Sequence, residues 1–161
     1  MAEWRHRRNW FMLLLGLCCI WIFANSLFDG GISSALSGHV LYLLQKAFSR
    51  LGGNPDILTM HRIRKVAHFL QYAMLGMLLF LSNSKIGKQR MYPSLFWGLV
   101  IALLDECLQL LVPGRAGMVQ DVLLDFSGVI FGVGAGYLLQ LLWKHFTRDH
   151  SQSYSQGQGD E

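Results

Sequence analysis

Four segments of the chain are each apolar over a length close to that of a membrane span. They cover residues 10–28, 66–82, 95–112 and 122–143. A transmembrane helix needs about 20 predominantly apolar residues. Within the hydrocarbon core, a helix satisfies all of its own backbone hydrogen bonds. The pattern therefore predicts an all-α integral membrane protein, with the four spans forming a four-helix bundle in one domain of residues 1–146.

The low content of charged residues supports a membrane location. Only 15% of the 161 residues are charged and 52% are hydrophobic, whereas about 25% of a typical soluble domain is charged. This composition excludes a disordered chain, a coiled coil and a nucleic-acid module with a broad basic face. The net charge of +4 is attributed to basic residues in membrane loops, so no nucleic acid is expected as a partner.

The segments that flank the spans have their own patterns. Residues 36–51 are amphipathic but too short and too polar to cross a bilayer, which predicts an interfacial helix between the first and second spans. The polar tail, residues 147–161, is predicted to be disordered. The first span follows basic residues, as in a signal peptide, but it exceeds the about 7–15 apolar residues typical of one. A retained span is therefore favoured over cleavage after Ser26.

The basic residues predict the orientation. Dense clusters flank the spans on the side of the chain termini, and they are Arg5, Arg7 and Arg8, then Lys85, Lys88 and Arg90, then Lys144 and Arg148. Because cytoplasmic loops carry an excess of Lys and Arg, we expect a multi-pass protein with both termini in the cytoplasm. The cysteines lie in apolar runs without metal-ligand spacing, and they are interpreted as packing residues rather than a disulfide framework.

In this topology the polar residues of three spans fall into one layer near the outer leaflet. These residues are Lys65, His68, Tyr72, Asp105, Glu106, Gln109, Arg115, Asp121 and Asp125. The spacing from Lys65 to Tyr72 places three of them on one helix face. Below Asp125, glycines at positions 128, 132 and 136 continue a face of the fourth span, which allows another helix to approach closely.

Ionisable residues inside a membrane cost about 2.5–3.5 kcal/mol each and usually have a function. Four acids in this layer compete for two nearby bases, Lys65 and Arg115, so a proton, a metal ion or a cationic group is the expected partner. His68, Asp105 and Glu106 are the candidate acid/base residues. The candidate substrate-binding residues are Lys65, Tyr72, Gln109, Arg115, Asp121 and Asp125. The competing interpretation is that salt bridges tie the helices together and that His68 is a packing residue.

No cofactor and no metal site are predicted, because the chain carries no signature such as H-E-x-x-H. A weaker variant remains, in which four side chains bind a hard divalent ion for hydrolysis. Those side chains are His68, Glu106, Asp121 and Asp125.

The ordered motifs resemble those of a known family. They are Lys65-x-x-His68-Phe69-x-x-Tyr72-x-x-Leu75-Gly76, Asp105-Glu106-x-x-Gln109, Pro113-Gly114-Arg115 and Asp121-x-x-x-Asp125-x-x-Gly128-x-x-x-Gly132. Together they are similar to the VanZ-like family of bacterial membrane proteins over most of residues 10–143. The resemblance implies the bacterial cytoplasmic membrane and a link to the cell envelope. The founding member of that family is associated with low-level resistance to the glycopeptide teicoplanin.

Three functions are compatible with these features, and whether the chain is an enzyme stays open. The first is binding or modification of an anionic membrane lipid or lipid-linked cell-wall precursor at the outer leaflet, with Lys65 and Arg115 holding a phosphate. The second is a non-enzymatic membrane factor whose buried charges are structural ties. The third is a small flippase or proton-coupled transporter, which a homodimer through the glycine-rich helix face would supply with more spans.

Overall fold

The protein is described by a computed structural model that covers residues 2–27, 30–83, 87–112 and 117–156. Within these ranges all regular elements are helical, which confirms the all-α class. In chain order they are α1 (Ala2–Leu27), α2 (Gly30–Arg50), η1 (Pro55–Ile57), α3 (Met60–Ser82), η2 (Gly87–Arg90), α4 (Met91–Gln109) and α5 (Val119–Gln156).

Four stretches are helical, long and apolar enough to cross a membrane, which confirms the four predicted spans. They are Asn9–Leu27, Met60–Ser82, Gly87–Gln109 and Val119–His145. Large apolar side chains on them face outward, and Trp21 and Phe131 are both more than 60% exposed. Ser26, Asp105 and Asp125 are buried instead. This distribution is opposite to that of a water-soluble core and suits a lipid environment.

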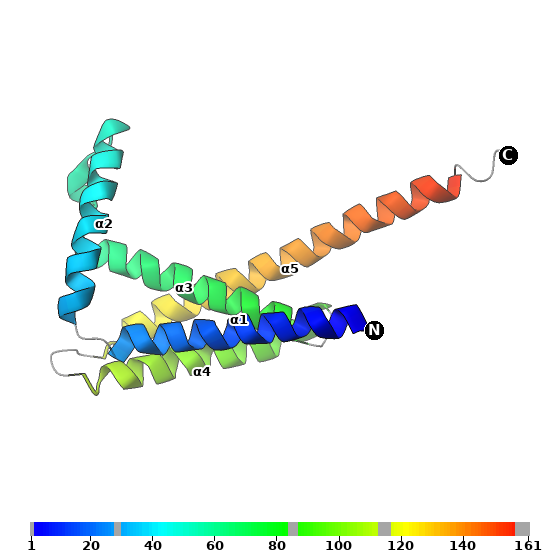
Figure 1. Ribbon diagram of the computed structural model, residues 1–161, viewed down its shortest axis with the longest axis horizontal. Helices are drawn as coiled ribbons and strands as arrows, with labels where there is room; N and C mark the ends of the chain where they lie inside the picture. The colour runs from blue at the N-terminus through cyan, green and yellow to red at the C-terminus, as the bar shows by residue number, and fades with distance from the viewer. Residues whose placement is uncertain (1, 28–29, 84–86, 113–116, 157–161) are drawn as a thin grey trace.

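The four spanning helices lie side by side and alternate in direction (Figure 1). As a result, the ends of α1 and α4 and the starts of α3 and α5 meet at one end of the bundle. We call this the polar end and define it by Ser26, Lys65, Asp105 and Asp121. The helix α2 stands across the bundle at this end, and α5 projects beyond the bundle at the opposite end (Figure 1).

The helix α2 has the features of the predicted interfacial helix, although it begins at Gly30, six residues earlier than expected. Its side chains Tyr42 and Leu43 are more than half exposed. It touches α3 and η1, and the Gln45 amide donates to the carbonyl of Leu58 at 2.9 Å. Gly52, with φ of +79°, then reverses the chain, a conformation that glycine adopts without steric cost.

The helices that carry the spans begin earlier than the sequence predicts, as α3 and α4 illustrate. The helix α3 begins at Met60 rather than near residue 66, because Thr59 caps it by accepting the N–H of Arg62 at 3.4 Å. The helix α4 begins at Met91, directly after η2. It ends at Gln109 rather than near residue 112. Beyond Gln109 the N–H of Leu111 bonds to the carbonyl of Leu108, three residues back, instead of to a carbonyl four residues back as in an α-helix.

The backbone of the C-terminal tail is helical over the part that the structure describes, and the disorder expected for residues 147–161 stays a prediction. The backbone of residues 147–156 continues α5, and residues 157–161 lie outside the described part of the chain. Between Gly136 and Gly157 the sequence has neither Gly nor Pro. A helix that is already nucleated by a membrane span gains one hydrogen bond for each added residue, so polar residues alone do not end it.

The contact between α3 and α5 is the most extensive in the bundle, and it is built on glycines. A Cβ atom added at Gly132 would overlap the carbonyl of Ala73, and one at Gly128 would lie 2.5 Å from the carbonyl oxygen of Phe69. Gly76 meets the backbone of Val129 in the same way from the opposite side. The glycine face is thus covered by α3 of the same chain, and a homodimer through it would require α3 to leave.

We expect Gly132→Ala to destabilise the protein by about 1–3 kcal/mol, because the added methyl group has to push α3 and α5 apart. The matched control is Gly134→Ala on the same helix, since a Cβ at Gly134 meets no atom within 4 Å. Thermal unfolding in detergent measures both. Equal unfolding temperatures for the two variants would contradict the close helix contact.

Candidate functional site

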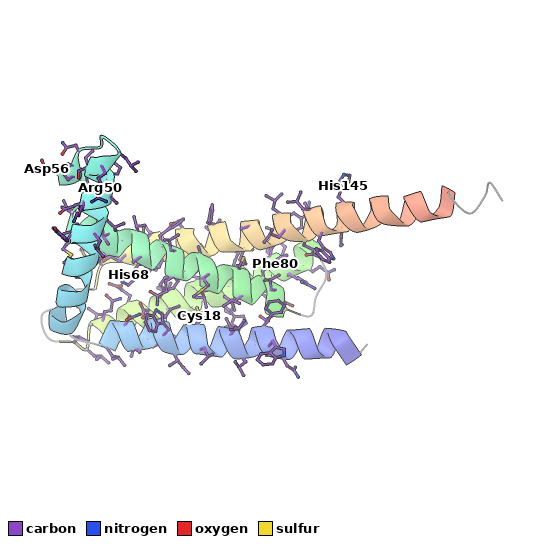
Figure 2. The ribbon with its side chains drawn as sticks, turned by 45° about the horizontal axis from the view of Figure 1, so that its top comes forward. Cys18, Arg50, Asp56, His68, Phe80 and His145 are labelled. Atoms are coloured by element: carbon purple, nitrogen blue, oxygen red, sulfur yellow. The ribbon has the colours of Figure 1, made fainter. Side chains whose placement is uncertain are left out.

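The polar end gathers side chains from four helices into a buried cluster. Asp105 is 0% exposed, Asp125 2% and Ser26 1%, and Glu106 and Tyr72 are buried beside them. His68 lies on α3 at the same end of the bundle (Figure 2). Because the helices alternate in direction, residues far apart in the chain meet in this layer, such as Ser26 and Asp105 at a separation of 79 positions.

Asp105 joins α1 to α4. Its Oδ1 accepts a short hydrogen bond from the hydroxyl of Ser26, and its Oδ2 accepts one from the Gln109 side chain at 3.2 Å. Ser26 is absent from the predicted site residues. The signal that could have found it is a small polar residue at the end of an apolar run, at the membrane depth where the acids gather.

Glu106 fixes the connection between α4 and α5. Its Oε1 accepts the backbone N–H of Met118 at 2.6 Å, and the carbonyl of Met118 in turn accepts the N–H of Asp121 at 2.9 Å. The carboxylate thereby satisfies an N–H group at the start of α5 that no carbonyl of that helix can reach. Glu106 thereby connects the start of α5 to the end of α4.

Two charge pairs connect α3 to α5 at increasing depth. The outer pair joins Lys65 Nζ to Asp121 Oδ1 at 3.6 Å, with both side chains about one third exposed. The inner pair joins His68 Nδ1 to Asp125 Oδ1 at 3.7 Å. Both distances exceed those of ordinary hydrogen bonds. Neither Asp121 Oδ1 nor Asp125 Oδ1 accepts a hydrogen bond, although both atoms are buried.

The predicted site residues therefore meet at one end of the bundle, with one exception. Lys65, His68 and Tyr72 contribute from α3; Asp105, Glu106 and Gln109 from α4; Asp121 and Asp125 from α5. Arg115 lies outside the described residues. The arrangement positions these groups for contact with one another, and their catalytic or substrate-binding roles stay predictions.

The inner part of the cluster also has the composition of a cation site. His68, Asp105 and Asp125 each offer a ligand atom, and these atoms lie within 4.8 Å of one another. They come from three different helices and are separated by 37 and 20 residues in the sequence. That separation is why no metal-binding signature is visible in the sequence.

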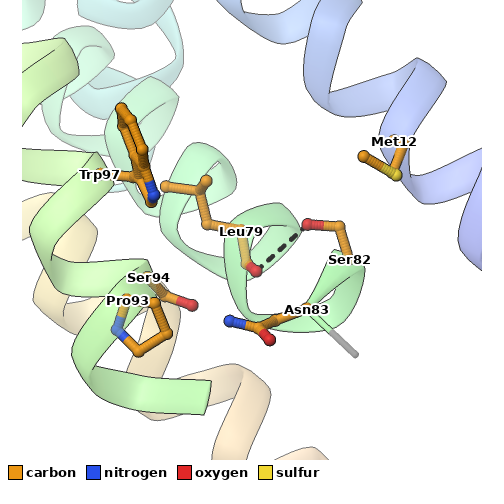
Figure 3. A pocket seen from close by; sticks show the side chains of 7 residues that line it. All are labelled: Met12, Leu79, Ser82, Asn83, Pro93, Ser94 and Trp97. Carbon is orange, nitrogen blue, oxygen red and sulfur yellow. Dashed lines mark hydrogen bonds between the residues drawn. The ribbon is translucent and has the colours of Figure 1, made fainter. Parts of the chain in front are cut away.

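A hollow of about 420 Å³ lies at the opposite end of the bundle, between α1, α3 and α4 (Figure 3). It is lined by Met12, Leu79, Ser82, Asn83, Pro93, Ser94 and Trp97. The hydroxyl of Ser82 bonds to the carbonyl of Leu79 on its own helix, as Figure 3 shows. The predicted site residues do not line this hollow, so it is separate from the polar cluster.

The comparison with known families covers most of the chain. Residues 11–142 match the VanZ/LLP1 family, a range that contains the polar end and nearly all of the four apolar spans. No curated protein and no solved structure matches the chain. The family expected from the ordered motifs is confirmed, and the chain belongs to the VanZ/LLP1 family of membrane proteins.

Proposed function

We propose that the protein serves the bacterial cell envelope by binding the phosphate head group of a lipid-linked molecule at the polar end, in the outer leaflet of the cytoplasmic membrane. The observation that carries this proposal is the position of Lys65. Its ammonium group lies at the exposed edge of the buried cluster, and its side chain is 37% exposed. We call this edge the rim and define it by Arg62, Arg64, Lys65 and Asp121. Family membership supports an envelope role linked to glycopeptide resistance.

The rim offers several positive charges to an anion. Arg62 and Arg64 are exposed on the first turns of α3, next to Lys65. The ion pair between Lys65 and Asp121 is partly exposed and longer than a hydrogen bond. A pair of this kind contributes little stability, so an incoming phosphate can compete for the ammonium group at small cost.

The buried acids limit how deeply such a head group can enter. Asp105, Glu106 and Asp125 lie behind the rim, and those of them that are ionised repel a phosphate. The favoured position of the anion is therefore at Lys65, with its lipid tail along the apolar outer surface of the helices. His68 is the next side chain inward and is 29% exposed, so it is the group best placed for proton transfer if the bound lipid reacts.

A second candidate function is that of a non-enzymatic membrane factor whose buried charges are structural ties. The hydrogen bond between Ser26 and Asp105 favours it, because this bond fastens α1 to the rest of the bundle. The bond from Met118 to Glu106 fastens α4 to α5 in the same manner. In this case loss of a tie lowers stability and leaves phosphate binding intact.

We expect Lys65→Ala to weaken binding of a polyprenyl monophosphate about tenfold, because charge-assisted hydrogen bonds contribute about 1.5–3 kcal/mol. Lys88→Ala is the matched control, since Lys88 is an exposed lysine at the opposite end of the bundle. Native mass spectrometry in detergent measures both variants against the uncharged polyprenyl alcohol. Undiminished, phosphate-dependent binding in Lys65→Ala would refute the proposed site.

The proposed orientation predicts which loops are reachable from outside the cell. Asp56 in η1 and Lys88 in η2 are both exposed and belong to connections at opposite ends of the bundle, which the proposed orientation puts on opposite sides of the membrane. A membrane-impermeant maleimide should label Asp56→Cys in intact cells and Lys88→Cys only after lysis, with the unmodified chain as the background control. The reverse pattern would mean that the polar end faces the cytoplasm.

For the structural tie, we expect Ser26→Ala to lower stability by about 1 kcal/mol, since it removes a hydrogen bond to a buried carboxylate. Ser127→Ala is the matched control, because the exposed Ser127 hydroxyl bonds only to the carbonyl of Leu124 on its own helix. Thermal unfolding and lipid binding are measured on the same samples. Unchanged stability in Ser26→Ala would remove the support for the second candidate.

A further inference from the structure

We propose that His68, Asp105 and Asp125 together bind one divalent transition-metal ion inside the polar end. The three residues come from α3, α4 and α5, and their ligand atoms lie within 4.8 Å of one another. This site goes beyond lipid binding at the rim and does not depend on it. Its location is one layer deeper, behind the pair of Lys65 and Asp121.

The distances are close to those that a metal ion imposes. Zinc binds His nitrogen at about 2.0–2.1 Å and carboxylate oxygen at about 2.0–2.2 Å. Adjacent ligand atoms around such an ion are then about 3.4 Å apart in tetrahedral geometry. The separation of His68 Nδ1 and Asp125 Oδ1 is 3.7 Å. The three ligand atoms as a set lie within 4.8 Å of one another, so side-chain rotations that shorten these separations are needed to form a coordination sphere.

A second observation points to a ligand at the same place. Asp125 is 2% exposed, yet its Oδ1 accepts no hydrogen bond and the facing His68 nitrogen is too distant to donate one. A buried carboxylate oxygen without a partner is costly and uncommon in folded proteins. A metal ion between His68 and Asp125 would satisfy this oxygen.

The surrounding charges also favour a cation. Three carboxylates are buried here, those of Asp105, Glu106 and Asp125, while the ammonium of Lys65 is held by Asp121 at the rim. One imidazole with two carboxylates suits Zn²⁺ or Mn²⁺ better than an all-oxygen ion such as Mg²⁺. The hydrogen bonds from Ser26 and Gln109 orient Asp105, as supporting residues commonly orient metal ligands.

The test is metal binding by the full chain, purified in detergent without a histidine tag and stripped with EDTA. On return of Zn²⁺ or Mn²⁺, we expect about one bound ion per chain and a rise in the thermal unfolding temperature. Asp125→Asn and His68→Gln should each lose at least about tenfold in affinity, since even supporting residues of metal sites contribute that much. Asp56→Asn, the same chemical change at an exposed position, should bind as the unmodified chain does.

Electron paramagnetic resonance of bound Mn²⁺ gives a readout that needs no variant. Coupling to one imidazole nitrogen is expected in the unmodified chain, and it keeps the proposal testable if Asp125→Asn fails to fold. Failure to retain either ion at micromolar concentration would overturn the proposal. So would equal affinity in His68→Gln, or Mn²⁺ bound without nitrogen coupling.

Discussion

The burial of carboxylates between membrane-spanning helices is the constraint on which the arrangement of this bundle depends. No water is available inside a bilayer to solvate Asp105, so its oxygens need partners from the protein itself. Gln109 supplies one partner from the same helix, and Ser26 supplies the other from α1, which it does only while α1 and α4 keep their relative positions. The polar contacts thereby define how the helices are placed along one another, which apolar side chains facing lipid cannot do.

The glycine contact between α3 and α5 makes this polar arrangement geometrically accessible. Because Gly128 and Gly132 carry no side chain, the two backbones approach closely just below the cluster. That approach brings Lys65 and His68 opposite Asp121 and Asp125 at a spacing of one helical turn. Bulkier residues would move the helices apart and lengthen both pairs, which already exceed hydrogen-bond distance. The packing motif and the polar site are therefore one structural unit.

The sequence was sufficient to predict the four spans and the layer that holds the polar residues. Apolar length determines a span, and alternating direction places the start of α3 beside the end of α4. The bounds were less accurate, because local contacts such as the cap at Thr59 decide where a helix begins. The bond between Ser26 and Asp105 and the grouping of His68, Asp105 and Asp125 were not predicted, since each depends on how the helices rotate to face one another.

The rim and the interior of the polar end suit ions of opposite charge. The basic rim suits an anion, and the acidic interior suits a cation. In the proposed function, an anion bound at Lys65 would be held near the exposed edge by the acids behind it, whereas a cation would be drawn inward toward Asp125. A bound ion would lower the negative charge of the interior and weaken the repulsion that a head group meets. The occupancy of the inner site would then control how tightly the rim binds phosphate, because two ligands of opposite charge stabilise one another across a short distance.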